Sequence, residues 1–167
     1  MKRLILIALL MLVSVSSVIY AQEKKSKKER RQEQADKVQK MVEAQDYKFV
    51  AQRALPMSGR SINLTSDYDL RVSNDSISAY LPYFGRAYVA PMNPTEGGIR
   101  FESMDFNYRL ENAKKGGWNV IITIKDTPRR IEMILNVASN GSAHLSVNDD
   151  TRQNISFSGN IGERKKK

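Results

Sequence analysis

The residues of this chain that could carry out chemistry are few, and they do not form a recognisable catalytic set. There is one histidine, His144, and there is no cysteine. Catalysis by a serine or cysteine nucleophile needs a base beside the nucleophile, but His144 alternates with apolar neighbours and should therefore face solvent. Zinc and transition-metal sites need several nitrogen or sulfur ligands. The sequence therefore predicts no cofactor and no metal site, and it favours a protein that is not an enzyme.

Two pairs of acidic residues are the other candidates for chemistry. Asp67 and Asp69 should share the polar face of one strand, and Asp149 and Asp150 lie in a predicted turn. Neither pair has the ligand-dense spacing of a calcium loop, so a solubilising role at the surface is favoured for both. A glycosidase can use two carboxylates that are distant in the sequence. A hydrolase acting on envelope glycan or lipid therefore stays open as the alternative function.

One stretch, from Tyr80 to Gly98, combines residues that brace a loop with residues that favour contact. It holds three of the five prolines and three of the nine glycines, together with four aromatic residues. Aromatic side chains in a proline-braced loop predict an ordered segment that packs on something. A surface that binds a ligand or protein partner would consist of Tyr80, Tyr83, Phe84, Arg86 and Tyr88. In this hypothesis Phe84 anchors the loop, while Arg86 with Tyr83 or Tyr88 stays accessible. The alternative is that these side chains only cover the end of the core.

This stretch and its surroundings also resemble a known protein family. The residues that carry the resemblance are Ala54 to Met57, Leu64-Thr65 with Tyr68, Tyr80 to Tyr88, and Gly97 to Phe101. They resemble a family of exported proteins from Bacteroidales that is catalogued as domain of unknown function 4251. The resemblance covers residues 42–159, and it implies a signal peptide or lipoprotein start and a periplasmic or outer-surface location. It implies no activity, substrate or catalytic residue.

The first 21 residues have the pattern of a cleavable signal peptide. Met1-Lys2-Arg3 is a short positive start, Leu4 to Val13 is almost unbroken aliphatic, and Ala21 precedes a polar sequence. This order predicts cleavage after Ala21 and a periplasmic or secreted mature chain. A membrane anchor is the alternative, because Leu4 to Ala21 is just long enough to span a bilayer. Since there is no cysteine to carry acyl chains or to pair, we expect neither a lipoprotein nor disulfides.

The net charge of +9 is concentrated in two tails. Residues 22–40 hold eight Lys or Arg against four Asp or Glu, residues 164–167 are all basic, and residues 41–163 hold thirteen against fourteen. A nearly neutral folded part in an exported protein argues against nucleic acid as the partner. The tails should be solvated, with weak contact to anionic lipid head groups as the alternative. The expected partner of the folded part is an envelope ligand or protein.

The elements that must position these side chains follow from the spacing of apolar residues. Ala35, Val38 and then Met41 or Val42 recur with a helical period, which predicts one helix docked by a narrow stripe. After Asp46 the period changes to two, and glycine-containing turns separate the alternating runs. Trp118 should be a core residue on the same face as its second neighbours. The predicted fold is mainly β: an antiparallel meander of about 8–10 short strands that curls into a barrel or tight sandwich, with one N-terminal helix.

The predicted organisation of the chain has four parts. Residues 1–21 are the signal peptide and residues 22–30 a basic linker. Residues 31–160 form a single β domain with the N-terminal helix, and residues 161–167 form a basic tail. The chain is long enough for one domain with a substantial core.

Overall fold

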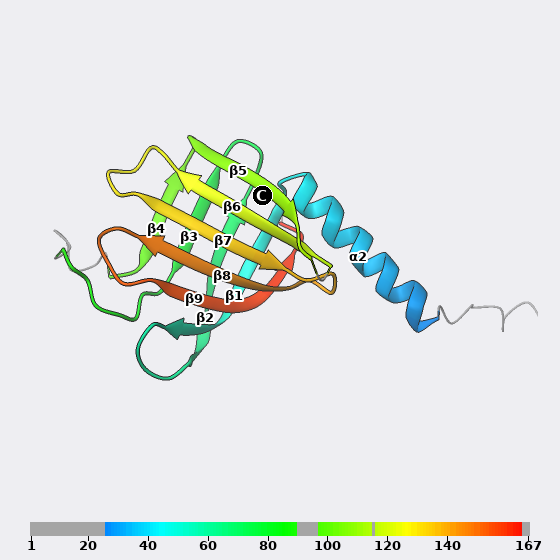
Figure 1. Ribbon diagram of the computed structural model, residues 1–167, viewed down its shortest axis with the longest axis horizontal. Coiled ribbons are helices and arrows are strands. Elements are labelled where there is room, and N and C mark those ends of the chain that lie inside the picture. The colour runs from blue at the N-terminus through cyan, green and yellow to red at the C-terminus, as the bar shows by residue number, and fades with distance from the viewer. Residues whose placement is uncertain (1–25, 90–96, 115, 165–167) are drawn as a thin grey trace, which may run out of the picture. The chain divides into compact units, whose positions relative to one another are not determined.

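The computed structural model describes residues 26–89, 97–114 and 116–164. The predicted signal peptide, residues 1–21, lies outside the described residues. The chain divides after Arg30 into two units, and the sheet and its contacts belong to the second unit. In that unit nine antiparallel strands form one sheet that curls into a nearly closed barrel (Figure 1). The strands are β1 (Tyr47–Pro56), β2 (Ile62–Val72), β3 (Ile77–Leu81), β4 (Ile99–Ser103), β5 (Phe106–Asn112), β6 (Trp118–Ile124), β7 (Ile131–Val137), β8 (Ser142–Asp149) and β9 (Ile155–Gly162).

The strands form an antiparallel meander in which the first strand, β1, pairs with the last, β9. Their order is β4-β3-β2-β1-β9-β8-β7-β6-β5, so that β1 pairs with both β2 and β9, while β4 and β5 are the two edges. Gly116 and Gly117 precede β6 and Gly141 precedes β8, and all three adopt positive φ, which glycine allows at the turns of hairpins. The prediction of a mainly β antiparallel meander with one helix is confirmed.

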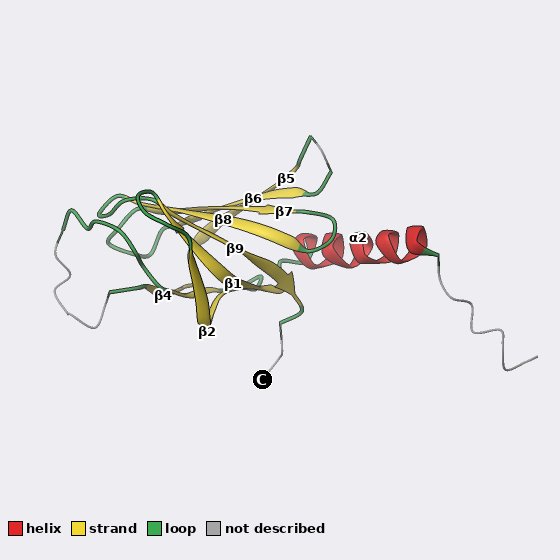
Figure 2. Cartoon of the chain, turned by 90° about the horizontal axis from the view of Figure 1, so that it is seen from below, coloured by secondary structure: helices red, strands yellow, loops and turns green. Residues whose placement is uncertain are grey.

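The inner face of the sheet forms one apolar core. Alternate residues of β6 and β7 are buried, and Trp118 lies on the same face as Val120 and Ile122, as predicted. Large side chains occupy the interior. Phe49 and Phe157, for example, are fully buried between the layers. Figure 2 shows β5 to β8 in one layer and β1, β2 and β4 in the other. Burial of this apolar surface supplies the main stabilisation of the fold.

Strand β1 has an irregularity near its middle. Its register with both β2 and β9 shifts between Ala51 and Arg53, which is the mark of a β-bulge. Gly159 lies opposite Ala51, and a Cβ atom on it would collide with the backbone oxygen of Val50. Only a glycine therefore allows the two backbones to approach at this bulge.

Helix α2 runs from Lys27 to Glu43. It begins with a capping box, in which the Glu29 amide donates to Ser26 Oγ (3.2 Å) and the Ser26 amide donates to Glu29 Oε2 (2.7 Å). The helix therefore includes residues that were predicted as linker. Val38 and Val42 are buried against the core, as the apolar stripe predicted. No helix in the described ranges combines the length and apolar character needed to cross a bilayer.

The C-terminal end of the sheet extends further than predicted. β9 runs to Gly162, so two residues that were predicted as tail belong to the sheet. Arg164 Nε donates to Asp46 Oδ1 at 2.9 Å, which ties the end of β9 to the residue before β1. Residues 165–167 of the predicted tail lie outside the described residues.

Candidate functional site

The five residues that were predicted to form a contact surface lie at the end of β3 and in residues 82–89, called the aromatic loop below. Tyr83 and Phe84 are half-buried and pack against the core. Arg86 is exposed, and 64% of Tyr88 is exposed. Tyr80 belongs to β3 and is 41% exposed. Of the five predicted residues, Tyr83 and Phe84 therefore face the core, Arg86 and Tyr88 face solvent, and Tyr80 lies on the sheet.

The backbone of the aromatic loop is held by the turn between β8 and β9. The Tyr88 amide donates to the Thr151 oxygen (2.8 Å), and the Gln153 amide donates to the Arg86 oxygen (3.0 Å). The Arg86 amide donates in turn to the side-chain oxygen of Gln153 (3.2 Å). Hydrogen bonds on both sides of Arg86 thus give the exposed side chains a fixed backbone.

The half-buried side chain of Tyr83 also connects the aromatic loop to the turn between β8 and β9. Its hydroxyl lies 2.9 Å from the Arg86 oxygen and 3.1 Å from the Gln153 oxygen, so one hydrogen is shared between two acceptors. The Arg152 guanidinium stands 4.8 Å from the centre of the ring. Burial raises the pKa of Tyr83, and Arg152 lowers it in part. The hydroxyl therefore stays protonated near neutral pH and remains a donor.

Asp149, at the end of β8, is a buried carboxylate beside this turn. Its side chain is only 2% exposed, and its Oδ2 lies 3.2 Å from Arg129 Nη1 and 3.1 Å from Arg152 Nε. The Arg152 Nε–H is not aligned with this oxygen, so that contact is an ion pair without a hydrogen bond. Thr151 donates to Oδ1 from both its amide (2.9 Å) and its hydroxyl (2.6 Å). The predicted solubilising role is therefore wrong for Asp149, which ties the turn together.

Asp69 departs from the prediction in the same way. It is buried on the outer face of β2, with Lys48 Nζ at 2.9 Å and Arg71 Nη2 at 3.1 Å from its Oδ2. The long basic side chains on β1 and β2 cover the carboxylate, which explains why an outward-facing acid is not solvated. Asp67, its predicted companion, is exposed, so the two acids do not form a joint site.

Tyr80 lies opposite Asp69 on the outer face of the sheet, and its own contacts are with other residues. Its ring stacks on Tyr68 at a centroid distance of 5.5 Å. Arg100 lies 4.5 Å from the centre of the ring and donates to the hydroxyl at 3.2 Å. Tyr68 and Arg100 both contact the ring of Tyr80, so this ring is less available to a partner than the ring of Tyr88.

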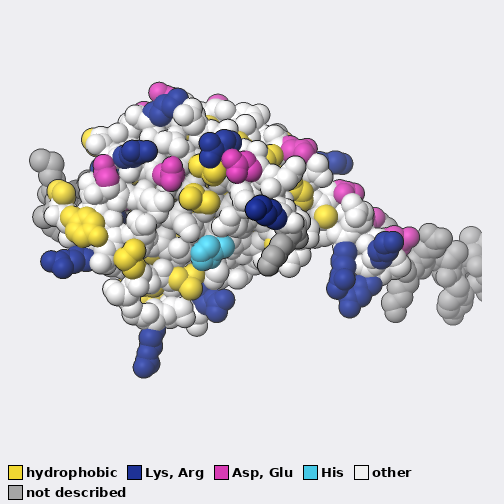
Figure 3. Space-filling view, in the orientation of Figure 1, with side chains coloured by type: hydrophobic (Ala, Val, Ile, Leu, Met, Phe, Trp, Pro, Cys, Tyr) yellow, Lys and Arg dark blue, Asp and Glu magenta, His cyan; other side chains and the backbone are white. Residues whose placement is uncertain are grey.

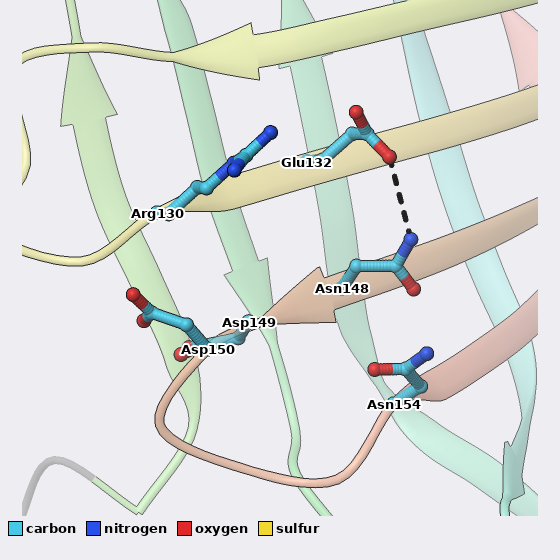
Figure 4. A pocket seen from close by; sticks show the side chains of 6 residues that line it. All are labelled: Arg130, Glu132, Asn148, Asp149, Asp150 and Asn154. Carbon is cyan, nitrogen blue, oxygen red and sulfur yellow. Dashed lines mark hydrogen bonds between the residues drawn. The ribbon is translucent and has the colours of Figure 1, made fainter.

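A second candidate site is an open surface depression of about 290 Å³. Figure 4 shows its lining at the start of β7, at the end of β8 and just before β9. All six lining residues are polar: Arg130, Glu132, Asn148, Asp149, Asp150 and Asn154. Asn148 donates to Glu132 Oε1 at 3.5 Å. No group of three or more His, Asp or Glu side chains within the described ranges is placed to hold a metal ion.

Sequence reasoning missed most of this depression. It singled out Asp149 and Asp150 but not Glu132, Asn148 or Asn154. The alternation in β7 and β8 places Glu132 and Asn148 on the outer face, and this signal was available. Their closeness could not be predicted, because it depends on the register between β7 and β8, in which Glu132 pairs with Asn148.

Comparison with known proteins gives the family of the chain. A similar fold occurs in the crystal structure of a DUF4251 family protein from Bacteroides eggerthii, with a TM-score of 0.58 and 14% sequence identity over 78% of this chain and 87% of that one. At this identity the likeness concerns the fold alone. No curated protein matches the chain. The model of the family described as "Domain of unknown function (DUF4251)" matches residues 29–161, and the chain therefore belongs to this family.

Proposed function

We propose that this chain is an exported, non-catalytic envelope protein that binds a protein partner through the aromatic loop. The observation that carries the proposal is the exposure of Arg86 and Tyr88 on a backbone that is hydrogen-bonded on both sides. Arginine and tyrosine are enriched among the residues that dominate binding energy at protein interfaces. A backbone that is already ordered also lowers the entropy cost of association.

The chemistry of the loop indicates what kind of surface it would contact. Tyr88 and its neighbour Val89, which is 61% exposed, offer adjacent apolar area. Arg86 can form a charge-assisted pair with a carboxylate. A partner with an apolar patch beside an acidic residue would match this arrangement. Tyr83 and Phe84 would contribute by holding the loop and not by contact.

Export is the part of the proposal that rests on the sequence. The positive start, the aliphatic stretch and the small residue Ala21 support secretion. N-terminal sequencing of the protein from fractionated cells should give a chain that begins at Gln22 in the periplasmic or secreted fraction. Uncut chain in the inner membrane would contradict this and support the anchor.

The hydrolase alternative gains no specific support from the geometry. A glycosidase needs two carboxylates on either side of a bound substrate. Asp69 and Asp149 are each engaged by two basic side chains. Such pairing fixes the position of each carboxylate and occupies it with basic side chains of the protein itself.

The binding proposal can be tested by photo-crosslinking in cells. Tyr88 is replaced by p-benzoylphenylalanine, and Asn107, exposed on the outer face of β5, is replaced in the same way as the control position. We expect a discrete protein adduct from position 88 that is absent from position 107. Adding Arg86→Ala should reduce the yield at 88 by about tenfold. The same adducts from both positions, or no adduct at 88, would contradict the proposal.

A further inference from the structure

The depression at the start of β7 and the end of β8 points to a second function that is independent of the aromatic loop. We propose that it binds a neutral saccharide. Its lining comes from the start of β7, the end of β8 and the turn before β9, and Figure 4 shows Glu132 and Asn148 pointing toward each other.

The lining offers the hydrogen-bonding groups that a sugar needs. Every hydroxyl of a sugar both donates and accepts a hydrogen bond. Glu132 and Asp150 supply acceptors, Arg130 supplies donors, and the amides of Asn148 and Asn154 supply both. Among the described residues, all six side chains that line the depression carry a hydrogen-bonding group.

The charges of the lining favour a neutral ligand. Asp149 is already paired with Arg129 and Arg152, which leaves Glu132 and Asp150 against Arg130. The Asp149 group carries one carboxylate and two guanidinium groups, so together with Glu132, Asp150 and Arg130 the charges around the depression sum to zero and favour an ion of neither sign. On the face of the molecule shown in Figure 3, acidic and basic side chains are interspersed. There is thus no extended field of one sign to attract a charged ligand.

Part of the lining is held in place before any ligand arrives. Asp149, one of the lining residues, is fixed by two ion pairs and two hydrogen bonds from Thr151. Asn148 and Glu132 lie on paired strands, with a long contact of 3.5 Å between their side chains. Fixed donors and acceptors reduce the entropy that binding would otherwise cost.

Further polar groups continue from the depression along the outer face. The next row of the sheet places the hydroxyls of Ser146 and Ser156 3.2 Å apart. The row after it aligns Asn136, His144 and Ser158 across β7, β8 and β9. Hydrogen-bonding groups on successive rows would contact successive units of a chain. The arrangement therefore suits an oligosaccharide better than a single sugar.

Titration of defined tetrasaccharides tests the proposal. Chitotetraose, cellotetraose and maltotetraose are each added to the 15N-labelled protein as purified from cells, and amide chemical shifts are followed. We expect saturable shifts with at least one of them, centred on residues 130–132, 148–150 and 154. The double variant Asn148→Ala/Asn154→Ala should weaken that response by about tenfold, since it removes several hydrogen bonds. Asn107→Ala, on the same outer face, is the matched control and should leave the response unchanged.

Three results would overturn the proposal. The first is the lack of saturable shifts at these amides with all three tetrasaccharides. The second is an equal response from the double variant, provided that its amide spectrum shows a native fold. The third is a stronger response of the same amides to inorganic phosphate or lysine, which would indicate a site for charged ligands. Because Arg86→Ala should leave saccharide binding unchanged, the two proposed functions can fail separately.

Discussion

The hydroxyl of Tyr83 lies 2.9 Å from the backbone oxygen of Arg86, three residues further along the chain. The same hydroxyl reaches the oxygen of Gln153 in the turn between β8 and β9. A half-buried tyrosine thus joins two segments that are distant in the sequence. This relationship explains how an irregular loop can present Arg86 and Tyr88 at a fixed place.

Gly85 should be required for this arrangement. A Cβ atom at residue 85 would lie 2.8 Å from the Tyr83 hydroxyl oxygen, so Gly85→Ala must displace the ring. We expect a loss of about 1–2 kcal/mol in the free energy of unfolding, measured with urea. Gly97→Ala is the matched control, because nothing lies within 4 Å of its added Cβ. Equal stability of the two variants would show that Tyr83 does not hold the loop.

Phe84 and Arg86 should differ in their effect on stability. Phe84 is half-buried against the core, so Phe84→Ala should cost about 1–3 kcal/mol, less than a fully buried phenylalanine would. The hydrogen bonds described for Arg86 involve only its main chain. Arg86→Ala should therefore change stability by less than ~0.5 kcal/mol. Thermal denaturation separates the two cases, and unfolding of the Arg86→Ala protein would identify the arginine as a structural tie.

Alternation in the sequence was enough to predict the core, but the paired acids could not be predicted. A half-buried antiparallel sheet has period two, so the inner faces of β6 to β9 follow from their apolar residues alone. The burial of Asp149 depends on Arg129, which comes from the turn before β7, and on Arg152 beyond the end of β8. A local pattern carries no information about such a partner.

The aromatic loop shows the same limit. Its composition predicted an ordered segment with Phe84 inside, because four exposed aromatic residues would form an adhesive patch. The sequence did not indicate that Gln153 and Thr151 would hold its backbone, since these are ordinary polar residues in a turn. The depression was missed for a related reason, because the closeness of Glu132, Asn148 and Asn154 follows from strand register.

Trp118 should be one of the most sensitive core positions. It is buried with Val120 and Ile122, and Trp118→Ala is expected to destabilise the protein by about 3–5 kcal/mol. Asn107→Ala, on the exposed face of the neighbouring strand, should change stability by less than ~0.5 kcal/mol. Chemical denaturation measures both. A stable Trp118→Ala protein would mean that the faces of β6 are reversed.

One buried and one half-buried tyrosine should make the protein sensitive to alkali. Burial raises the pKa of Tyr108 to about 12, and burial, followed by the neighbouring Tyr108, raises the pKa of Tyr47. The Tyr108 hydroxyl donates to the backbone oxygen of Val42 at 2.8 Å, which ties α2 to the sheet. Because tyrosine titrates near pH 10 in the unfolded chain, the contribution of both groups is complete below pH 10. The contribution of Tyr108 is lost as the pH rises through 12.

Variants can assign this alkaline transition. In Tyr108→Phe the decline of the unfolding free energy between pH 10 and 12 should be shallower, and the stability at pH 7 should be lower by about 1 kcal/mol. Tyr88→Phe, with its exposed ring, should follow the unmodified protein throughout. Identical pH profiles for Tyr108→Phe and the unmodified protein would show that Tyr108 does not cause the alkaline transition.

The central claim is that the aromatic loop is held in place by the turn between β8 and β9 before any partner binds. Hydrogen exchange of individual amides in the isolated protein tests it most directly. The amides of Tyr88 and Gln153 donate across the contact, whereas that of Ala87 makes no main-chain bond among the described residues. After correction for intrinsic rates, we predict that Tyr88 and Gln153 exchange at least about tenfold more slowly than Ala87. Exchange of all three amides at the rate of an unfolded chain would contradict the claim.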